Sequence, residues 1–229
     1  MILAIMQPYL LPYIGYWQLI HSADKFVIFE DHKYIKQGFM NRNSFLVNGN
    51  PYRFIMELKG ASQNKMINEI EIGQNRLRIL KTMEISYKKA PYYADAFPVL
   101  KAIMENPDNN LASFLRHSIE RICDYLDIRT TIISSCDFDR DRSLKAQSMV
   151  IDMCKRLDAS QYNNSIGGMA LYDKESFKQN GIDLYFIETK PFEYPQLASE
   201  FVPNLSIIDI MMSNPKDRIQ EILENYALV

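Results

Sequence analysis

Cysteine is scarce in this sequence, which has three such residues in 229. Cys123, Cys136 and Cys154 are odd in number and show none of the close spacings that metal sites use. The sequence therefore indicates neither a disulfide framework nor a zinc site, and we expect no bound metal. Free thiols of this kind are typical of proteins that work in the reducing cytoplasm.

Long apolar segments are also missing. No stretch approaches the ~18 to 20 consecutive apolar residues that a membrane span requires. The apolar segment from Met1 to Tyr16 has no basic residues at its start and contains Gln7 and three tyrosines, unlike a secretory signal. We therefore expect a cytoplasmic protein without a membrane span.

The sequence has no excess of positive charge and no internal boundary. Lys and Arg total 26 against 28 Asp and Glu, a formal net charge of -2, whereas nucleic-acid-binding proteins concentrate basic residues on one face. We expect no nucleic-acid partner. The length permits one large α/β domain or two small ones. Because there is no repeat, low-complexity tract or Gly/Ser-rich linker, we expect a single domain over residues 1–229.

The sequence does contain an alternation of short apolar strands and amphipathic helices. Residues 2–6 form an unbroken apolar run typical of a buried strand, residues 14–21 have an apolar helical face, and residues 25–29 repeat the strand pattern. Such a βαβ unit exposes the loop after its first strand at the carboxyl edge of the sheet, where binding sites form. Further strands are expected at 67–72, 130–133 and 182–187, and further helices at 76–89, 94–104, 111–126, 144–157 and 215–226. Together they predict an α/β fold with a Rossmann-like, mostly parallel sheet flanked by helices.

A β-hairpin is predicted to interrupt this alternation. Residues 44–47 and 52–58 have strand patterns, and Asn48-Gly49 between them favours the positive φ angles of a tight turn. We expect an inserted hairpin region at about residues 44–72.

Two stretches far apart in the sequence carry most of a family resemblance. The first is Met6-Gln-Pro-Tyr-Leu-Leu-Pro-Tyr-Ile-Gly-Tyr16, and the second runs from Tyr162 to Tyr172 and contains Gly167-Gly168. They are accompanied by Ala23-Asp-Lys-Phe26, Lys36, Asn41-Arg-Asn43, Tyr87-Lys-Lys-Ala-Pro-Tyr92, Tyr194-Pro-Gln196 and Leu205-Ser-Ile-Ile-Asp209. In order and spacing these motifs resemble the WbqC-like protein family over nearly the full length.

The resemblance implies a bacterial family associated with O-antigen and other surface-polysaccharide gene sets. Its members look like sugar-modifying acyl- or aminoacyl-transferases, including suspected glycine transferases. Family members commonly carry a Ser-Gly-Pro-Gly-Gly loop, where this chain has Asn164-Ser-Ile-Gly-Gly168. The glycine pair is kept and a turn-forming proline is absent, which leaves the substrate open. The motifs also make Tyr172, Gln196 and Asp209 candidates for substrate binding.

The loop after the first strand supplies further candidates. Gln7 and Tyr9 follow that strand, where an amide and a phenol can orient a sugar hydroxyl or an acyl carbonyl. Tyr13, Gly15 and Tyr16 stand where adenylyl-transferring α/β folds have a His-x-Gly-His motif at a helix start, which attracts phosphates. A phenol does not replace imidazole at a pentavalent phosphate, so nucleotidyl transfer is not inferred. The alternative is that these tyrosines are packing aromatics with satisfied hydroxyls.

Cations and backbone donors for an anionic or carbonyl group come from two segments. Lys36 and Arg42 are the cation candidates, with Asn41 and Asn43 as neutral donors and acceptors. The alternative for Asn41-Arg-Asn43 is a turn before the hairpin. Gly167 and Gly168 would let the backbone approach a ligand and present N–H groups, or they form a tight loop. We expect Arg42 and Gly168 to share one polar cleft.

Asp31 and His32 are the candidate catalytic residues. They follow the second predicted strand, and either could act as a general base toward a sugar amine or hydroxyl. Adjacent side chains usually diverge, so we expect one of the two to point inward. Cys136 follows Ser134-Ser135 after the strand at 130–133, a position at which a thiol nucleophile could operate. No histidine is near it in sequence, and we favour a buried structural thiol.

Together with these candidate residues, the resemblance implies an acyl- or aminoacyl-transferase that acts on an amino-sugar nucleotide in surface-polysaccharide biosynthesis. A carrier-bound thioester is the more natural donor, because the sequence has no phosphate-cradling Gly-rich Lys loop; the partners would be the nucleotide sugar and an acyl-carrier protein. The alternative is a non-catalytic sugar- or nucleotide-binding scaffold for glycan assembly. The sequence indicates no particular cofactor and no oligomeric state.

Overall fold

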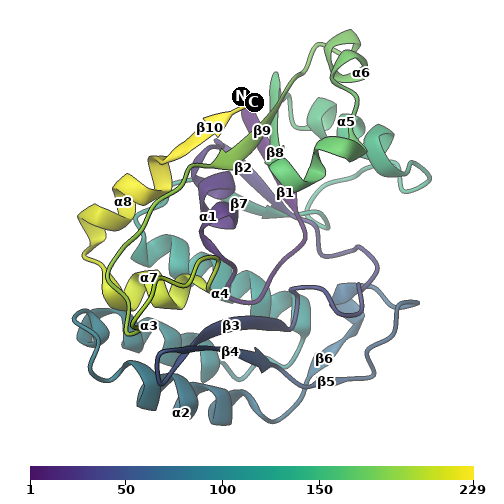
Figure 1. Cartoon of the computed structure of the whole chain (residues 1–229). Helices are drawn as coiled ribbons and strands as arrows, with labels where there is room; N and C mark the ends of the chain where they lie inside the picture. The colour runs from purple at the N-terminus through teal and green to yellow at the C-terminus, as the bar shows by residue number, and fades with distance from the viewer.

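Short apolar strands build the central sheet of the computed structural model, which describes residues 1–229 (Figure 1). All neighbouring strands are parallel except the two that come last in the sequence, which are antiparallel. In spatial order the strands are β10 (Tyr226–Leu228), β9 (Asp183–Thr189), β8 (Gln161–Ser165), β1 (Ile2–Met6), β2 (Lys25–Ile28) and β7 (Thr131–Ser134). The predicted Rossmann-like, mostly parallel sheet is confirmed.

Helices cover both faces of this sheet because successive side chains of a strand point to opposite sides. Leu3 and Val27 pack into a cluster with residues of α5 and α6, whereas Ala4 and Phe26 belong to a larger cluster with residues of the other helices. One face therefore carries α5 (Ala146–Arg156) and α6 (Lys174–Gln179). The larger cluster includes α1 (Ile14–His21), α4 (Leu111–Tyr125), α7 (Ile207–Ser213) and α8 (Lys216–Glu224). None of the helices is both long and apolar enough to cross a membrane.

The strand order creates a crevice beside β1. The chain passes outward from β1 to β2 and β7, and then returns to the other side of β1 to form β8 and β9. The connections after β1 and β8 consequently leave the sheet in opposite directions, and ligands bind at such a switch point in open α/β sheets.

The long connection from β2 to β7 contains the predicted hairpin insertion, at the bottom of Figure 1. Its turn has φ angles of 51° at Asn48 and 77° at Gly49, as a tight hairpin turn requires. The elements before α4 are β3 (Arg42–Val47), β4 (Asn50–Ile55), β5 (Leu58–Lys59), the 3-10 helix η1 (Ile67–Glu69), β6 (Glu71–Ile72), α2 (Arg76–Tyr87) and α3 (Tyr93–Met104). Residues 67–72 thus form a helical turn and a two-residue strand, not the continuous strand predicted.

The main element that the sequence pattern does not predict is β8. Its residues are Gln-Tyr-Asn-Asn-Ser, and a polar run of this kind is not typical of a central strand. It is nevertheless buried between β1 and β9, where the Asn163 amide donates to the Ser22 carbonyl and hydroxyl oxygens. The glycine pair after it lies in a 3-10 helix, η2 (Ile166–Leu171), where we expected a loop.

A buried carboxylate ties the insertion to the C-terminal segment. Asp209 of α7 has no solvent exposure, and burial raises its pKa. Its two oxygens accept hydrogen bonds from the Tyr87 hydroxyl at 2.7 Å and from the Tyr194 hydroxyl and Gln196 amide, each at 2.8 Å. The Tyr87 hydroxyl also accepts from the Leu46 N–H of β3 at 3.0 Å. Three segments distant in sequence therefore share one hydrogen-bonded centre.

Removing the hydroxyl in Tyr87→Phe is expected to lower the free energy of unfolding by about 2–4 kcal/mol, because both the Leu46 N–H and one Asp209 oxygen lose a buried partner. Urea unfolding measures this change. Tyr52→Phe is the control, since Tyr52 is 46% exposed and its hydroxyl makes no hydrogen bond in the protein. Equal midpoints for the two variants would show that the network contributes no net stability.

Candidate functional site

A cleft of about 540 Å³ opens at the switch point between β1 and β8. Its walls come from the ends of β1 and β8, the segment after β2, the first turns of α5 and the helix η2. Its lining residues are Ile5, Met6, Gln7, Tyr9, Phe29, His32, Ile35, Ala146, Gln147, Met149, Val150, Tyr162, Asn164, Ser165, Gly167, Gly168, Leu171 and Tyr172. The cleft thus brings together the N-terminal motif and the Gly-Gly segment.

The lining is mostly apolar and almost free of charge. It contains no Lys, Arg, Asp or Glu, and its polar side chains are amides, hydroxyls and the imidazole of His32. Burial raises the pKa of Tyr9 and of Tyr172 above the ordinary phenol value, so these phenols stay protonated near neutral pH. Neutral donors and acceptors of this kind suit a ligand rich in hydroxyl and amide groups.

Gln7 and His32 meet inside the cleft. The side-chain amide of Gln7 lies 2.8 Å from Nδ1 of His32, and the Lys33 carbonyl oxygen lies 3.0 Å from the same nitrogen. The Gln7 amide nitrogen faces Nδ1 and donates to the tautomer in which Nδ1 is bare, whereas the Lys33 carbonyl oxygen accepts from the tautomer that carries Nδ1–H. In the second tautomer the Gln7 amide turns its oxygen toward the ring, and Nε2 is the basic nitrogen. Nε2 makes no hydrogen bond within the protein, and the Phe29 ring packs on the imidazole at 5.0 Å between centroids. This pair is the arrangement in the cleft best suited to accept a proton.

The two glycines differ in what surrounds them. A side chain at Gly168 would place its Cβ 2.7 Å from Nδ2 of Asn164, whereas a Cβ at Gly167 would have nothing within 4 Å. Neither glycine has a positive φ angle. Gly168 is therefore needed for the close approach of Asn164, a buried amide whose oxygen accepts from the Ser165 N–H, and Gly167 is not.

Two helices begin at the cleft without side-chain caps. Neither the residue before α5 nor Ser165 before η2 makes a capping hydrogen bond through its side chain. Ala146, the first residue of α5, has a φ of 49°, and the Gln147 amide oxygen accepts from the Asp173 N–H at 2.6 Å. The first N–H groups of a helix lack intrahelical partners, so these starts can offer backbone donors to an anionic ligand.

The loop after β1 is fixed by hydrogen bonds from distant residues. Leu11 is buried with a φ of 45°, an unfavourable conformation for a leucine. The Asn43 amide donates to the Leu10 and Leu11 carbonyl oxygens at 3.2 and 2.7 Å, and the Ser206 hydroxyl donates to the Leu11 carbonyl at 2.6 Å. The Asn43 amide nitrogen thus positions Gln7 and Tyr9 through the backbone of this loop.

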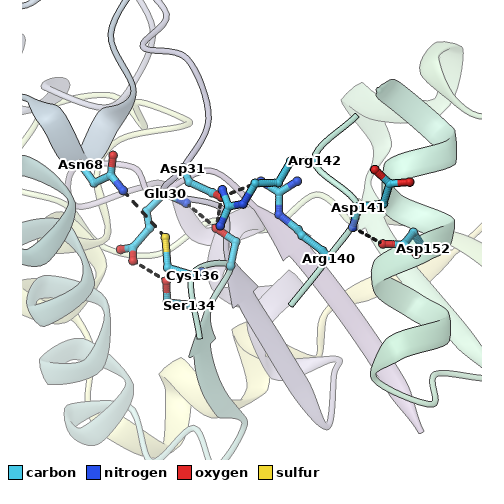
Figure 2. Close-up of polar contacts among 10 residues, drawn as sticks. Glu30, Asp31, Asn68, Ser134, Cys136, Arg140, Asp141, Arg142 and Asp152 are labelled. Atoms are coloured by element: carbon cyan, nitrogen blue, oxygen red, sulfur yellow. Dashed lines mark hydrogen bonds and ion pairs between the residues drawn. The ribbon is translucent and has the colours of Figure 1, made fainter. Parts of the chain in front are cut away.

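Asp31 lies beside the cleft in a network of its own (Figure 2). Arg140 and Arg142 contact one of its oxygens at 2.6 and 2.5 Å, reaching it from the side of α5, and the Ser135 hydroxyl donates to the other. Burial favours a higher pKa for Asp31, but the hydrogen bonds from Ser135 and the two arginines, with the charge of Arg140, lower it. Since both oxygens are occupied, the geometry favours His32 over Asp31 as a base.

Cys136 is exposed, so the expectation of a buried thiol is wrong. It follows β7, and its sulfur accepts a long contact of 3.8 Å from the Asn68 amide. Its pKa is raised by burial of the sulfur and then by the negative charge of Asp31. A thiol with a raised pKa is a poor nucleophile, and Cys136 does not line the cleft.

The remaining predicted residues lie outside the cleft. Tyr13 and Asn43 line a neighbouring hollow. Gly15 and Tyr16 are buried in α1, where the Tyr16 hydroxyl donates to the Gln7 carbonyl oxygen at 3.0 Å. Gln196 and Asp209 belong to the buried network described above.

The charged segment predicted to bind anions also lies elsewhere. Lys36 is exposed, and the Asn41 amide donates to the Met56 carbonyl oxygen at 2.8 Å. Arg42 begins β3, and its Nε is buried without a partner. The expectation that Arg42 and Gly168 share one cleft is wrong, because Arg42 belongs to the hairpin insertion and not to the end of a strand in the main sheet.

Sequence reasoning did not single out several residues of the lining. Asn164 and Ser165 stand in the Tyr162 to Tyr172 stretch of the resemblance, which was a usable signal, but their position depends on β8. The sequence pattern gives no indication that Gln147 or Phe29 lines a site. Gln147 lies in the first turn of a helix, and Phe29 lies at the end of an apolar strand. No group of three or more His, Cys, Asp or Glu side chains is arranged to hold a metal ion.

Comparison with known proteins identifies a family and a relative of this chain. Residues 7–221 match the model of the WbqC-like protein family. A protein of Mycobacterium tuberculosis, named as uncharacterized protein Rv1507c, is 26% identical over 215 residues, which cover 92% of each chain. No solved structure matches the chain.

Asp31→Asn is expected to lower the free energy of unfolding by about 3–5 kcal/mol at neutral pH, because Arg140, whose side chain is 5% exposed, loses its counterion. The folded-state pKa of Asp31 lies below the ordinary value of 3.8. The stabilisation is therefore present above that value and is lost as the pH falls through the lower folded value. Urea unfolding of wild type and variant at several pH values between neutral and acid should show the two midpoints converging at acid pH.

Asp139→Asn is the control for this series, since the Asp139 side chain is 99% exposed and lies 3.9 Å from Arg156. Its midpoint should follow that of the wild type throughout. A difference between wild type and Asp31→Asn that stays constant from neutral to acid pH would contradict the assigned role of the carboxylate.

Proposed function

The chain belongs to the WbqC-like protein family, and from this premise we propose that it transfers an acyl or aminoacyl group to the amine of a nucleotide-linked amino sugar in surface-polysaccharide biosynthesis, including O-antigen. The observation that carries the proposal is the uncharged cleft at the switch point, which combines apolar and aromatic side chains with three amides and has the Gln7 and His32 pair in its wall. The protein would work in the cytoplasm, where nucleotide sugars are made and used.

The sugar is the part of the substrate that the cleft suits best. Hydroxyl and amine groups of a sugar need both donors and acceptors, and Gln7, Gln147 and Asn164 supply both from one lining. Aromatic rings from Tyr9, Tyr162 and Tyr172 complement the apolar faces of a sugar ring. A cleft of about 540 Å³ also falls in the range of small-molecule sites.

The phosphates of the substrate would be bound by backbone groups. No lysine or arginine lines the cleft, so a cation-based site is not available there. The uncapped first turn of α5 presents N–H groups and the positive end of the helix dipole. The first turn of η2, with Gly167 and Gly168, would supply further N–H donors.

His32 would act as the general base. The amine nitrogen of the sugar attacks the carbonyl carbon of the donor thioester and forms a tetrahedral intermediate, while Nε2 of His32 accepts the amine proton. The intermediate then collapses to the amide as the C–S bond breaks, and the departing thiolate takes the proton from His32. The N–H groups of Gly168 and its neighbours would stabilise the oxyanion of the tetrahedral intermediate. Asp31 would hold the segment that carries His32 through its contacts with Arg140 and Arg142.

The rival function is a non-catalytic sugar- or nucleotide-binding protein that serves as a scaffold for glycan assembly. It is favoured by one observation: apart from tyrosines, His32 is the only ionisable side chain of the lining. Many transferases use a second ionisable group as an acid. Ligand binding without turnover across a broad panel of donors would favour this rival.

Incubation of the protein with nucleotide-linked amino sugars and acyl or aminoacyl thioesters on a carrier protein should give a product whose mass equals that of the sugar plus the acyl group. His32→Gln should lower the rate by about 10²–10⁴-fold while the affinity for the nucleotide sugar stays within a few fold. His117→Gln is the matched control, because His117 lies in α4 and does not line the cleft. Full activity of His32→Gln would remove the proposed base.

The two glycines offer a second, independent test. Gly168→Ala should weaken binding of the nucleotide sugar by on the order of ten-fold, because its Cβ would displace the Asn164 amide from the cleft. Gly167→Ala should bind as the wild type does, since its Cβ enters open space. Isothermal titration calorimetry measures both affinities, and thermal unfolding checks that both variants are folded. Equal affinities for the two variants would contradict the assigned role of Asn164 and Gly168.

A further inference from the structure

A second hollow, of about 380 Å³, adjoins the cleft. It is lined by Tyr9, Pro12, Tyr13, Phe39, Asn43 and Asn204. Tyr9 belongs to the walls of both spaces, and Ile35 borders the cleft a few residues before Phe39 borders the hollow. A ligand longer than one of these spaces can therefore extend past Tyr9 into the other.

Aromatic rings dominate the hollow, and two of them are exposed. Phe39 is 57% exposed and Tyr13 is 36% exposed. The Tyr9 ring lies 5.8 Å from the Phe39 ring and 5.5 Å from the Tyr16 ring, measured between centroids. Exposed aromatic side chains gathered around a concave site are typical of ligand binding, and they favour a flat, unsaturated ligand group that can stack on them.

Gly15 allows Tyr13 to stand in this position. A Cβ at Gly15 would lie 2.6 Å from the Tyr13 ring and 2.8 Å from its hydroxyl oxygen. The ring therefore covers the first turn of α1, and it turns what would be an open helix start into an aromatic wall. This accounts for the glycine in the Tyr13-Ile-Gly-Tyr16 motif.

The hollow has two neutral side-chain amides, which differ in their hydrogen bonding. The Asn43 nitrogen is committed to the carbonyl oxygens of Leu10 and Leu11. The exposed Asn204 amide makes no hydrogen bond in the protein. A free amide offers one donor and one acceptor side by side, which matches the hydrogen-bonding edge of a nucleobase. No charged side chain lines the hollow, so it is unsuited to a phosphate.

We propose that this hollow binds the nucleobase of a nucleotide-linked sugar, with the base stacked between Tyr13 and Phe39 and its edge bonded to Asn204. The inference rests on the proposed function and adds the direction in which the substrate lies. The base occupies the hollow, the ribose passes Tyr9, and the phosphates and sugar lie in the cleft near the starts of α5 and η2.

Isothermal titration calorimetry with uridine 5′-monophosphate, adenosine 5′-monophosphate and ribose 5-phosphate tests the assignment. The wild type should bind at least one of the two nucleotides ten-fold or more tightly than ribose 5-phosphate, which lacks a base. Phe39→Ala should lose most of that advantage, since base stacking on an aromatic ring contributes on the order of ten-fold or more. Asn204→Ala should lose a few fold and should reduce the difference between the two nucleotides.

Ile85→Ala is the control, because Ile85 is 58% exposed, like Phe39, but lies on α2 away from the hollow. Nucleotide affinity that is equal in wild type, Phe39→Ala and Asn204→Ala overturns the inference. The inference is also overturned if Phe39→Ala loses coenzyme A binding but keeps nucleotide binding. That result would assign the hollow to the thioester donor. In both cases the proposed function still stands if acyl transfer depends on His32. Conversely, if Phe39→Ala loses nucleotide binding but the wild type transfers no acyl group, the nucleobase site is supported and the transferase function is contradicted.

Discussion

Both candidate pockets depend on the hydrogen bonds that the Asn43 amide and the Ser206 hydroxyl donate to the loop after β1. These two side chains bind the carbonyl oxygens at Leu10 and Leu11, where the backbone adopts an unfavourable positive φ. A loop of this kind persists only when surrounding groups hold it. The walls made by Gln7, Tyr9 and Tyr13 follow directly from it, because all three are on the same short segment.

The groups that hold this loop are themselves held by the buried network around Asp209. Asn43 belongs to β3, the neighbouring Leu46 N–H donates to the Tyr87 hydroxyl, and Tyr87 donates to Asp209 of the helix that begins just after Ser206. The hairpin insertion and the C-terminal segment are thus joined to each other and, through them, to the carboxyl edge of the sheet. This explains why motifs from the whole length of the chain accompany the N-terminal motif. Many of their residues hold the loops of the site in place and do not line the cleft.

The sequence predicts the first βαβ unit, the hairpin and most helices, because their hydrophobic periodicity and turn residues act locally. It does not predict β8, whose polar residues are stabilised by neighbours on both sides, and without β8 the switch point cannot be located. Arg42 and Asp31 show the same limit for the candidate site. Both have the chemistry of binding residues, but Arg42 starts a strand of the insertion, and Asp31 is occupied by Arg140 and Arg142. The sequence shows the chemical type of each side chain, but it does not show which residue that side chain contacts in the folded protein.

The arrangement of charge at this edge of the sheet bears on how a ligand could be recognised. Arg140 and Arg142 both bind Asp31, and neither guanidinium lines the cleft. Recognition must then rely on helix starts, backbone N–H groups, amides and aromatic faces, all of which are fixed dipoles or neutral surfaces. Fixed dipoles stabilise developing charge without reorganising, and a neutral lining leaves His32 as its only side chain able to carry a full positive charge. A proton taken from an amine by His32 would therefore change the electrostatics of the whole cleft, which couples proton transfer directly to the stabilisation of an oxyanion in the same space.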